Sequence, residues 1–362
     1  NAGNVPAMTE THPRGPLKLR RAGFDDDQSM RALVAASFPG NPKVSADMTR
    51  WQWWENPFGE TLAWVWEDDG SIVAQYVAFC APGWIAGKRT TVTLGVDAAV
   101  DPAYQGRRLF TPLSEALYAD SVARGWPLYA YPNEQSWKGI SRAGWIEVSR
   151  PSVYVLIRPG GARWLASRLK LPAAVSPAIG MAARVGFRPR KPKGGPHAVA
   201  VLSSPPQDVE ELWTAVASAE ESGLERGANW WHWRYDAHPD KPYRFIEARR
   251  GGQLAGAAAV VTREELGGRF ICLLELLARD DDSARAVVAA IAGGSVGESD
   301  GIALTATRGS RLESLARVAG LRKVPGRLQH RPIRFGVVPQ PDVVPDPTAL
   351  RWATSWGDLD HT

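Results

Sequence analysis

The sequence predicts a mixed α/β (α+β) fold built from two tandem modules, each a mostly antiparallel sheet flanked by helices. The first observation behind this prediction is an internal repeat. Trp51–Trp53 matches Trp231–Trp233, and Gly87–Arg89 matches Gly267–Arg269, both at an offset of 180 positions. The second observation is that apolar runs and turn residues follow one another in the same order in both copies. A repeated order of elements is stronger evidence than any single motif, so we expect two similar modules in tandem.

The repeat divides the chain into five segments. The two modules are expected at 16–158 and 198–336, where the matching runs lie. Residues 1–15 are expected to form a flexible N-terminus. Residues 159–197 carry several prolines and a basic run, which is typical of an interdomain linker. Residues 337–362, rich in proline and polar groups, are interpreted as a C-terminal tail that lies on the surface.

The first part of module one predicts a strand, a helix and a hairpin. Leu17–Arg21 predicts the strand, and Asp25–Ala36 predicts an amphipathic helix whose first turn is acidic. Thr61–Trp66 and Ile72–Phe79 predict two antiparallel strands, because Asp68–Gly70 between them is typical of a tight hairpin turn.

The second part of module one alternates strands and helices. A long apolar strand leads into a polar loop, and a strand and a helix follow the first helix. The second helix stops at Gly144, a residue type that favours the left-handed conformation at helix ends. The expected elements are the strand Thr90–Val100, a helix from Leu109, the strand Leu128–Tyr131, the helix Asn133–Ala143 and a last strand at Val153–Arg158.

The loop Gln105–Phe110 joins the long strand to the first of these helices. Backbone N–H groups at a helix start, together with the positive end of the helix dipole, form a site for an anion such as phosphate. Arg107 and Arg108 add two positive charges to the loop. The sequence therefore predicts a phosphate-binding loop; the alternative is a turn that happens to be basic.

This region resembles the acyl-CoA site of the GNAT superfamily of N-acetyltransferases. An aliphatic residue, Val100, precedes Gln105 by five positions, and Gly106 follows it, as in the phosphate loop of the family. Downstream, an Asn, a small residue and a Gly-aromatic pair fall at the family's spacing; they are Asn133, Ser136, Gly144 and Trp145. Three positions depart from the pattern: Arg108 in the first Gly slot, Phe110 in the Gly/Ala slot, and Ile140 where many members carry a Tyr general acid.

The resemblance implies an acyl-CoA co-substrate, expected to be acetyl-CoA. No metal-ligand spacing appears in the sequence, so no metal is expected. It implies that the loop holds the pyrophosphate and that a backbone N–H beside Val100 binds the pantetheine arm or the thioester oxygen. Asn133 would reach the pantetheine arm, and it can also cap the helix that follows it; the two roles can coexist. The predicted cofactor-binding residues are Val100, Gln105, Gly106, Arg107, Arg108, Leu109, Phe110, Asn133 and Ser136.

Two carboxylates are candidates for the chemistry of acyl transfer. Asp97 lies on the strand that faces the active site in this superfamily, where it would anchor or deprotonate the substrate amine; the alternative is a structural or surface aspartate. Glu275 lies in the apolar run Leu273–Leu277 of the second module. It is expected either on a solvated edge or at a seam, where burial raises the pKa of a carboxyl, and only the second position would be functional.

The general acid is the residue that the sequence does not assign. Ile140 cannot donate a proton to the leaving thiolate. The alternatives are Tyr104, Tyr129, Tyr131 or water, or a thiolate that leaves unaided beside a protonated amine.

The second module is expected to have lost the cofactor. The segment Ala278–Gly301 is four residues shorter than Ala98–Gly125, and the deletion falls on the phosphate loop. In its place stands Arg279–Ser283, whose three aspartates suit helix capping and repel a pyrophosphate. We interpret the second module as structural, or as a wall of the acceptor pocket.

Composition limits the location and the partners. The net charge is +5 and the basic residues are dispersed, apart from Arg188–Lys193, so no nucleic-acid partner is expected. No apolar run is long enough to span a membrane, and a cytoplasmic location is the default expectation. Cys80 and Cys272 lie in apolar runs and are expected to be buried thiols. The 16 tryptophans favour core packing at a seam; the alternative is an aromatic wall for a sugar-like ligand.

The predicted function is transfer of an acyl group to an amine of a small molecule, such as an amino sugar or a natural product. The choice of substrate rests on the tryptophan content, on Asp97 and on the second module as a wall of the acceptor pocket. One alternative is an aminoacyl transferase like those of the FemABX family, which also pairs two such modules. Another is a catalytically silent CoA-binding or scaffold protein, which the departures at Arg108 and Ile140 would explain. The acceptor, the acyl length and the oligomeric state stay open.

Overall fold

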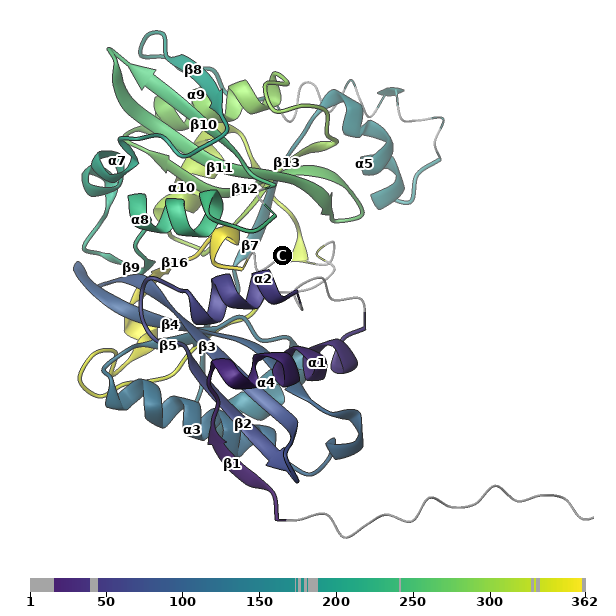
Figure 1. The fold of residues 1–362 in the computed structure, drawn as a ribbon. Coiled ribbons are helices and arrows are strands. Elements are labelled where there is room, and N and C mark those ends of the chain that lie inside the picture. Colours follow the sequence, from purple (N-terminus) through teal and green to yellow (C-terminus); the bar gives the residue numbers. More distant parts are fainter. Residues whose placement is uncertain are drawn as a thin grey trace, which may run out of the picture.

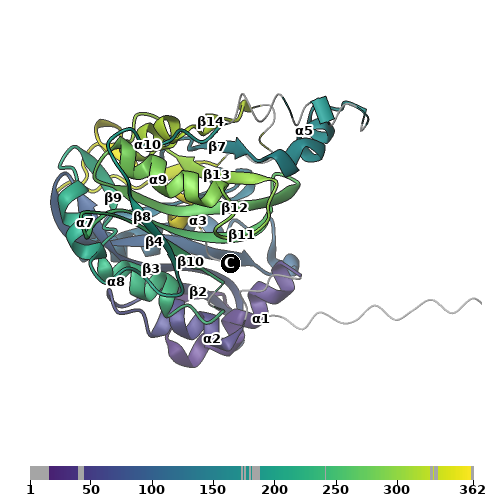
Figure 2. The same cartoon turned by 90° about the horizontal axis from the view of Figure 1, so that it is seen from above.

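The computed structural model describes residues 16–39, 45–172, 174, 177–178, 181, 188–240, 242–326, 329 and 333–359. These residues form two sheets with helices packed on them, one sheet above the other in Figure 1. Seen from above, the second sheet covers the first (Figure 2). The predicted α/β fold with two mostly antiparallel sheets is confirmed.

The first sheet is built mainly from the N-terminal half of the chain. Its strands are β1 (Lys18–Arg21), β2 (Leu62–Asp68), β3 (Ser71–Ile85), β4 (Lys88–Val100), β5 (Leu128–Ala130), β6 (Ile146–Ser149), β9 (Glu221–Leu224), β15 (Phe335–Val337) and β16 (Arg351–Ala353). Among the described residues the order is β1-β2-β3-β4-β5-β15-β6, with β9 paired to β3 and β16 paired to β9. Neighbours are antiparallel except for β4 with β5 and β16 with β9.

The second sheet repeats this arrangement. Its strands are β7 (Ser152–Ile157), β8 (Ala198–Leu202), β10 (Arg244–Arg250), β11 (Gln253–Glu265), β12 (Gly268–Ala278), β13 (Gly301–Ala306) and β14 (Arg322–Lys323). The order in the described residues is β14-β7-β13-β12-β11-β10-β8. Here β12 and β13 form the parallel pair, in the place that β4 and β5 hold in the first sheet.

The two sheets exchange their last strands. β7, which the sequence analysis placed last in module one, lies in the second sheet between β13 and β14. β15, from the end of module two, fills the equivalent place in the first sheet, between β5 and β6. The expected modules 16–158 and 198–336 are therefore continuous segments of the chain, whereas each sheet contains one strand from the other segment. A cut at residue 158 would leave β5 and β6 without the strand that joins them.

Helices cover the sheets and fill the space between them. They are α1 (Asp27–Ser37), α2 (Ala46–Thr49), α3 (Phe110–Ala123), α4 (Glu134–Ile140), α5 (Ala162–Arg168), α7 (Val209–Val216), α8 (Ala228–Trp231), α9 (Asp281–Ala292) and α10 (Arg311–Ala319). α3 packs on β2 and β3, and α9 packs on β10, β11 and β12. Most predicted elements of module one lie within a few residues of their expected limits, and the predicted turn at Asp69 and Gly70 has φ of 46° and 75°.

Each sheet buries both of its faces because successive side chains along its strands point into two different cores. Along β3, Val77 and Phe79 enter a central core that residues of both modules share. Tyr76 and Ala78, on the opposite face, pack in the core under α3. The period of two places these successive apolar residues on opposite sides. The central core therefore joins the two modules into one packed unit.

The tryptophan clusters form the seam between the modules. α2 and α8 each continue into a π-helical turn, Arg50–Trp54 and His232–Asp236, as the repeat predicts. The rings of Trp51 and Trp233 stack at 4.7 Å, and the Trp51 indole donates a hydrogen bond to the Trp233 carbonyl oxygen. Core packing is thus confirmed for these clusters, and the aromatic wall for a sugar is wrong because both rings are buried.

The expectation of a surface tail at 337–362 is wrong for its described part. Trp352 and Trp356 are 2% and 4% exposed. Residues Trp356–Asp358 form a helical turn that packs on β12 and β13. These two indoles carry enough apolar surface to hold a proline-rich segment in the interior.

A buried ion cluster fixes this segment in place. The Arg226 guanidinium, 7% exposed, donates to both carboxylate oxygens of Glu275 and to Asp358 Oδ1 at 2.7 Å. Tyr131 of the first module donates to Asp358 Oδ2 at 3.1 Å, and Tyr235 donates to Glu275 Oε1 at 2.9 Å. The cluster therefore joins the first module, the second sheet and the C-terminal segment. Loss of one partner from such a buried pair costs about 3–5 kcal/mol.

Acidification is expected to destabilise the protein through His238, which is fully buried at the seam. Burial lowers the pKa of this imidazole to about 3, with a smaller contribution from the Arg234 guanidinium. A histidine in the unfolded chain titrates at about 6.5. Between these values the unfolded state binds a proton that the native state does not. The free energy of unfolding therefore falls as the pH drops below about 6.5, by up to about 1.4 kcal/mol per pH unit.

Urea unfolding at about pH 5 and about pH 7.5 measures this loss. His238→Gln keeps an acceptor for the Asp240 N–H, which bonds to Nδ1 in the natural chain, and it is expected to shrink the loss. His232→Gln is the matched control, because that side chain is 72% exposed, and should leave the loss unchanged. An equal loss in the natural chain and in His238→Gln would contradict the assignment.

Candidate functional site

The site begins where β4 and β5 separate. The two strands pair in parallel from Thr93 to Gly95, and the pairing stops there although β4 runs on to Val100. A β-bulge follows, in which Asp97 and Ala98 together oppose one residue of β3. Asp97 has φ of 48°, in the left-handed region that aspartate tolerates better than most residues. Beyond Gly95, the β5 side of β4 therefore has no strand partner among the described residues.

The loop after β4 has the geometry of an anion-binding nest. Gly106 and Arg108 have φ of 80° and 60°, so left-handed residues alternate along the loop. Glycine adopts this conformation freely, whereas it costs arginine about 1–2 kcal/mol. The Arg108 side chain is exposed, so the backbone keeps the left-handed conformation that suits glycine while the guanidinium reaches solvent. The departure from the family pattern at this position thus leaves the loop geometry intact.

The start of α3 faces the same space. No side chain caps the helix at Leu109 within the described residues, and its first turn carries no acidic group. Its N-terminal N–H groups and the positive end of its dipole are therefore suited to an anion. α9 differs, because Asp280 caps it and accepts from the Ser283 N–H at 2.8 Å. The expected replacement of the phosphate loop by a capping carboxylate is confirmed there.

Phe110 fits the site because α4 carries a glycine opposite it. A Cβ on Gly139 would lie 2.2 Å from the Phe110 ring, so the ring occupies space that only glycine leaves. The ring also packs on Tyr76, with 5.4 Å between centroids. The aromatic residue in the Gly/Ala slot is therefore accommodated by a small residue across the groove.

A cavity of about 430 Å³ lies between the β4 end, the loop and α4. Eight of the nine predicted cofactor-binding residues line it: Val100, Gln105, Gly106, Arg108, Leu109, Phe110, Asn133 and Ser136. Arg107 does not, because its guanidinium stacks 4.7 Å over the ring of Tyr104, whose hydroxyl donates to Asp68. Sequence reasoning missed Ser37 and Phe38, which come from the distant end of α1.

Asn133 has the capping role that the sequence analysis left open. Its side-chain oxygen accepts from the Ser136 N–H at 2.8 Å and caps α4. Gly144 ends the following turn with φ of 87°. Asn133 also lines the cavity, so capping and a position in the groove coexist.

A second cavity of about 340 Å³ adjoins the first and contains Asp97. The two share Phe38, Ala98, Phe110, Asn133 and Ser136 as walls. Tyr76, Tyr131, Ile140 and Leu359 line the second cavity as well. The predicted phosphate loop and the predicted amine-binding aspartate thus open into neighbouring parts of one groove.

The tyrosines near the groove are poor proton donors. Burial raises the pKa of Tyr131 and of Tyr129 well above the usual value, and the Asp358 carboxylate raises both further. Burial also raises the pKa of Tyr76. A thiol with a pKa of about 8.5 forms a thiolate that cannot readily take a proton from such phenols. Tyr131 keeps its proton and donates it in a hydrogen bond to Asp358 Oδ2.

Glu275 lies elsewhere, in a cavity of the second module. It is 1% exposed, and Arg226, Trp230 and Tyr235 all donate to it. Burial raises its pKa, and the Arg226 guanidinium opposes that rise. Of the two expected positions, the buried seam is the observed one. The structure does not bring Glu275 into the groove of Asp97.

Cys80 and Cys272 are buried free thiols, as expected, and burial raises the pKa of Cys80 to about 12. In the part of the chain that the structure describes, no three His, Cys, Asp or Glu side chains gather in a way that could hold a metal ion. Within that same part, every helix is too short or too polar to cross a membrane.

Known structures share this architecture across both modules. A probable N-acyltransferase of Enterococcus faecalis V583 matches with a TM-score of 0.64 at 14% identity, over 92% of this chain and 74% of that chain. A GCN5-related N-acetyltransferase of Anabaena variabilis ATCC 29413 matches with a TM-score of 0.62 at 11% identity, over 89% and 72%. That of Kribbella flavida matches with a TM-score of 0.55 at 14% identity, over 89% and 70%. At these identities the likeness shows the fold.

Sequence comparison identifies the first module. No curated protein matches the chain by sequence. Residues 18–145, however, match the family model described as the acetyltransferase (GNAT) domain. The matched range covers β4, the loop, α3, β5 and α4, which together form the groove. Over residues 18–145 the first module is thus similar to acetyltransferase (GNAT) domains.

Proposed function

We propose that the first module transfers an acetyl group from acetyl-CoA to an amine of a small molecule. The observation that carries the proposal is the groove itself. An anion nest at Gly106–Phe110 opens into a cavity that contains the Asp97 carboxylate. A substrate with a phosphate group at one end and a reacting thioester at the other suits this arrangement.

The chain offers three kinds of contact to the co-substrate. The alternating loop and the start of α3 would receive the pyrophosphate, with Arg108 as an added charge. The unpaired edge of β4 after Gly95 would give backbone hydrogen bonds to the pantetheine arm. Asn133 and Ser136 would flank that arm from α4.

The second cavity suits an amine because the negative charge of Asp97 lines it, beside the neutral polar side chains of Asn133 and Ser136. The Tyr131 hydroxyl, which donates to Asp358, does not compete as a hydrogen-bond donor for the Asp97 carboxylate. Such a pocket stabilises an ammonium group and favours it over a neutral hydroxyl. The tryptophan content gives no support for an amino sugar, since the seam tryptophans are buried, so the small-molecule amine rests on Asp97.

The proposed reaction balances without a dedicated acid. Asp97 would take a proton from the ammonium, and the free amine would attack the thioester carbonyl. The C–N bond forms, the C–S bond breaks and the amide is released. The nitrogen gives up its second proton to solvent as the C–S bond breaks. The thiolate leaves without help from Ile140 and takes the proton held by Asp97, so the products are the amide, the thiol and one proton released to solvent.

Arg108→Ala is expected to weaken acetyl-CoA binding by about 3–10-fold, because it removes one exposed charge and keeps the same left-handed backbone cost. Gly106→Ala is expected to weaken binding more, since alanine at φ of 80° strains the nest. Arg107→Ala is the matched control, because that guanidinium stacks on Tyr104 and lies outside the cavity. Isothermal titration calorimetry measures all three. Equal losses in Arg107→Ala and Arg108→Ala would argue against this position for the phosphates.

Asp97→Asn is expected to lower kcat/KM by about 10²–10⁴-fold while leaving acetyl-CoA affinity within about twofold. Asparagine tolerates the left-handed φ of 48°, so the bulge should persist. Thiol release with a panel of amino sugars and natural-product amines measures turnover, and calorimetry measures affinity. If Asp97→Asn keeps full turnover on an amine that the natural chain acetylates, Asp97 is not the base.

A further inference from the structure

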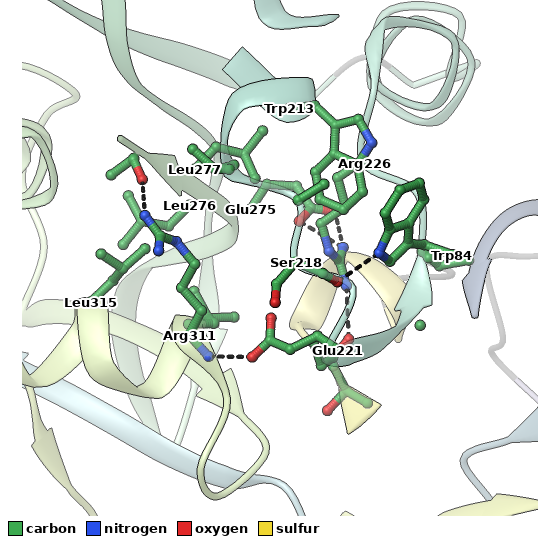
Figure 3. Close-up of a pocket in the computed structure, with 18 of the residues that line it drawn as sticks. Trp84, Trp213, Ser218, Glu221, Arg226, Glu275, Leu276, Leu277, Arg311 and Leu315 are labelled. Atoms are coloured by element: carbon green, nitrogen blue, oxygen red, sulfur yellow. Dashed lines mark hydrogen bonds and ion pairs between the residues drawn. The ribbon is translucent and has the colours of Figure 1, made fainter. Parts of the chain in front are cut away.

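The second cavity of the groove presents one charged side chain among the described residues that line it, and this side chain is Asp97. The carboxylate of Asp358, which accepts from the Tyr131 hydroxyl, does not line the cavity and is paired with Arg226 at 2.7 Å. Arg226 also binds Glu275, and Figure 3 shows these two side chains pointing toward one another. The described wall therefore carries a single negative charge, which matches a ligand with a single positive charge.

The neutral polar side chains of the wall lie where the two cavities meet. Asn133 and Ser136 line both cavities, and the Asn133 side-chain oxygen already accepts from the Ser136 N–H. In the function proposed above, these two residues flank the pantetheine arm. Among the described residues, the remainder of the wall therefore offers few side-chain partners to the hydroxyl groups of a sugar. A hydroxyl that leaves water without gaining a partner is costly.

Rings and aliphatic side chains form much of the wall around Asp97. Tyr76 packs on Phe110 with 5.4 Å between ring centroids, and Tyr131 packs on Phe335 at 5.1 Å, so these rings are held in place from behind. Such side chains favour an apolar ligand body, and the faces of aromatic rings attract an ammonium group beside them. The ring and aliphatic residues in question are Phe38, Tyr76, Phe110, Tyr131, Ile140 and Leu359.

The size of the cavity admits a ring and a short chain. Its volume is about 340 Å³, whereas a cavity of about 150 Å³ is enough to bind benzene. The space therefore holds an aromatic ring with a short aminoalkyl chain and leaves room for the acetyl group at the wall that the two cavities share. A monosaccharide would also fit by size, so the chemistry of the wall decides between the two.

We propose that the acceptor is a primary amine with one positive charge and an apolar body, such as an aromatic ring on a short carbon chain. Its ammonium group pairs with Asp97, and its body lies against the rings, Ile140 and Leu359. The inference rests on the function proposed above, because it names the substrate class of that same site. It makes an amino sugar or a polyamine the poorer acceptor.

Two matched pairs of amines test the substrate class in a thiol-release assay with the full chain and acetyl-CoA. Pentylamine and putrescine have about the same length and differ in the second ammonium group, whereas phenethylamine and glucosamine differ in the hydroxyls of the body. We expect kcat/KM to be at least about 100-fold higher for pentylamine than for putrescine, and for phenethylamine than for glucosamine. Similar values within either pair would overturn the inference and leave the proposed acetyl transfer standing.

Binding without turnover separates the failure of this inference from the failure of the proposed function. Saturation-transfer NMR with CoA present is expected to show phenethylamine bound to the natural chain, and at least about tenfold more weakly bound to Asp97→Asn. Phenethylamine that binds in this way but is not acetylated would contradict the proposed function and keep the substrate class. Absence of phenethylamine binding, or equal binding to Asp97→Asn, would overturn the substrate class whatever other amines are acetylated.

Leu359→Asp adds a second carboxylate to the wall and is expected to raise kcat/KM for putrescine relative to pentylamine by at least about tenfold. Phe38→Asp does the same from the end of α1, at a side chain that is 45% exposed and tolerates a charge. Leu171→Asp is the matched control, since Leu171 is 44% exposed and lies outside both cavities; it should leave the ratio unchanged. Circular dichroism checks that each variant folds. An unchanged ratio in every folded wall variant would overturn the inference.

Discussion

The buried guanidinium of Arg226 is the group on which the rest of the structure depends. It neutralises Glu275 of the second sheet and Asp358 of the C-terminal segment, and through Asp358 it reaches Tyr131 beside the candidate groove. Two buried carboxylates without this cation would repel each other and lose their solvation. The cluster therefore holds the C-terminal segment in the interior, and it also commits the Tyr131 proton away from the groove.

The exchange of β7 and β15 makes the two modules one structure. Each sheet takes its second-to-last strand from the other half of the chain, and the central core is filled from both sides. The second module can therefore lose its cofactor site and still be required, because the first sheet needs β15 and because Arg226 holds the C-terminal segment whose Leu359 lines the groove. The two modules differ at equivalent helix starts. An uncapped nest opens the groove at α3, whereas Asp280 closes the same position at α9.

Local patterns in the sequence predicted most of module one, because hairpin turns, helix caps and apolar periodicity depend on neighbouring residues. The turn at Asp69 and Gly70, the Asn133 cap and the cofactor loop are of this kind. The strand exchange was not predictable, since β7 reads as an apolar strand whichever sheet it joins. Phe38 entered the groove from far along the chain, and Asp358 paired with a distant arginine, so no spacing signalled either. Arg107 and Arg108 look alike in sequence, and only the backbone conformation separates their directions.

The central claim is that the chain has one acyl-CoA site, in the groove of the first module. A crystal structure of the full chain grown with CoA tests it most directly. The account predicts density for a pyrophosphate against the N–H groups of Gly106–Phe110 and for the pantetheine arm along β4 beyond Gly95. Density for CoA in the second module, or an empty first groove at saturating CoA, would contradict it.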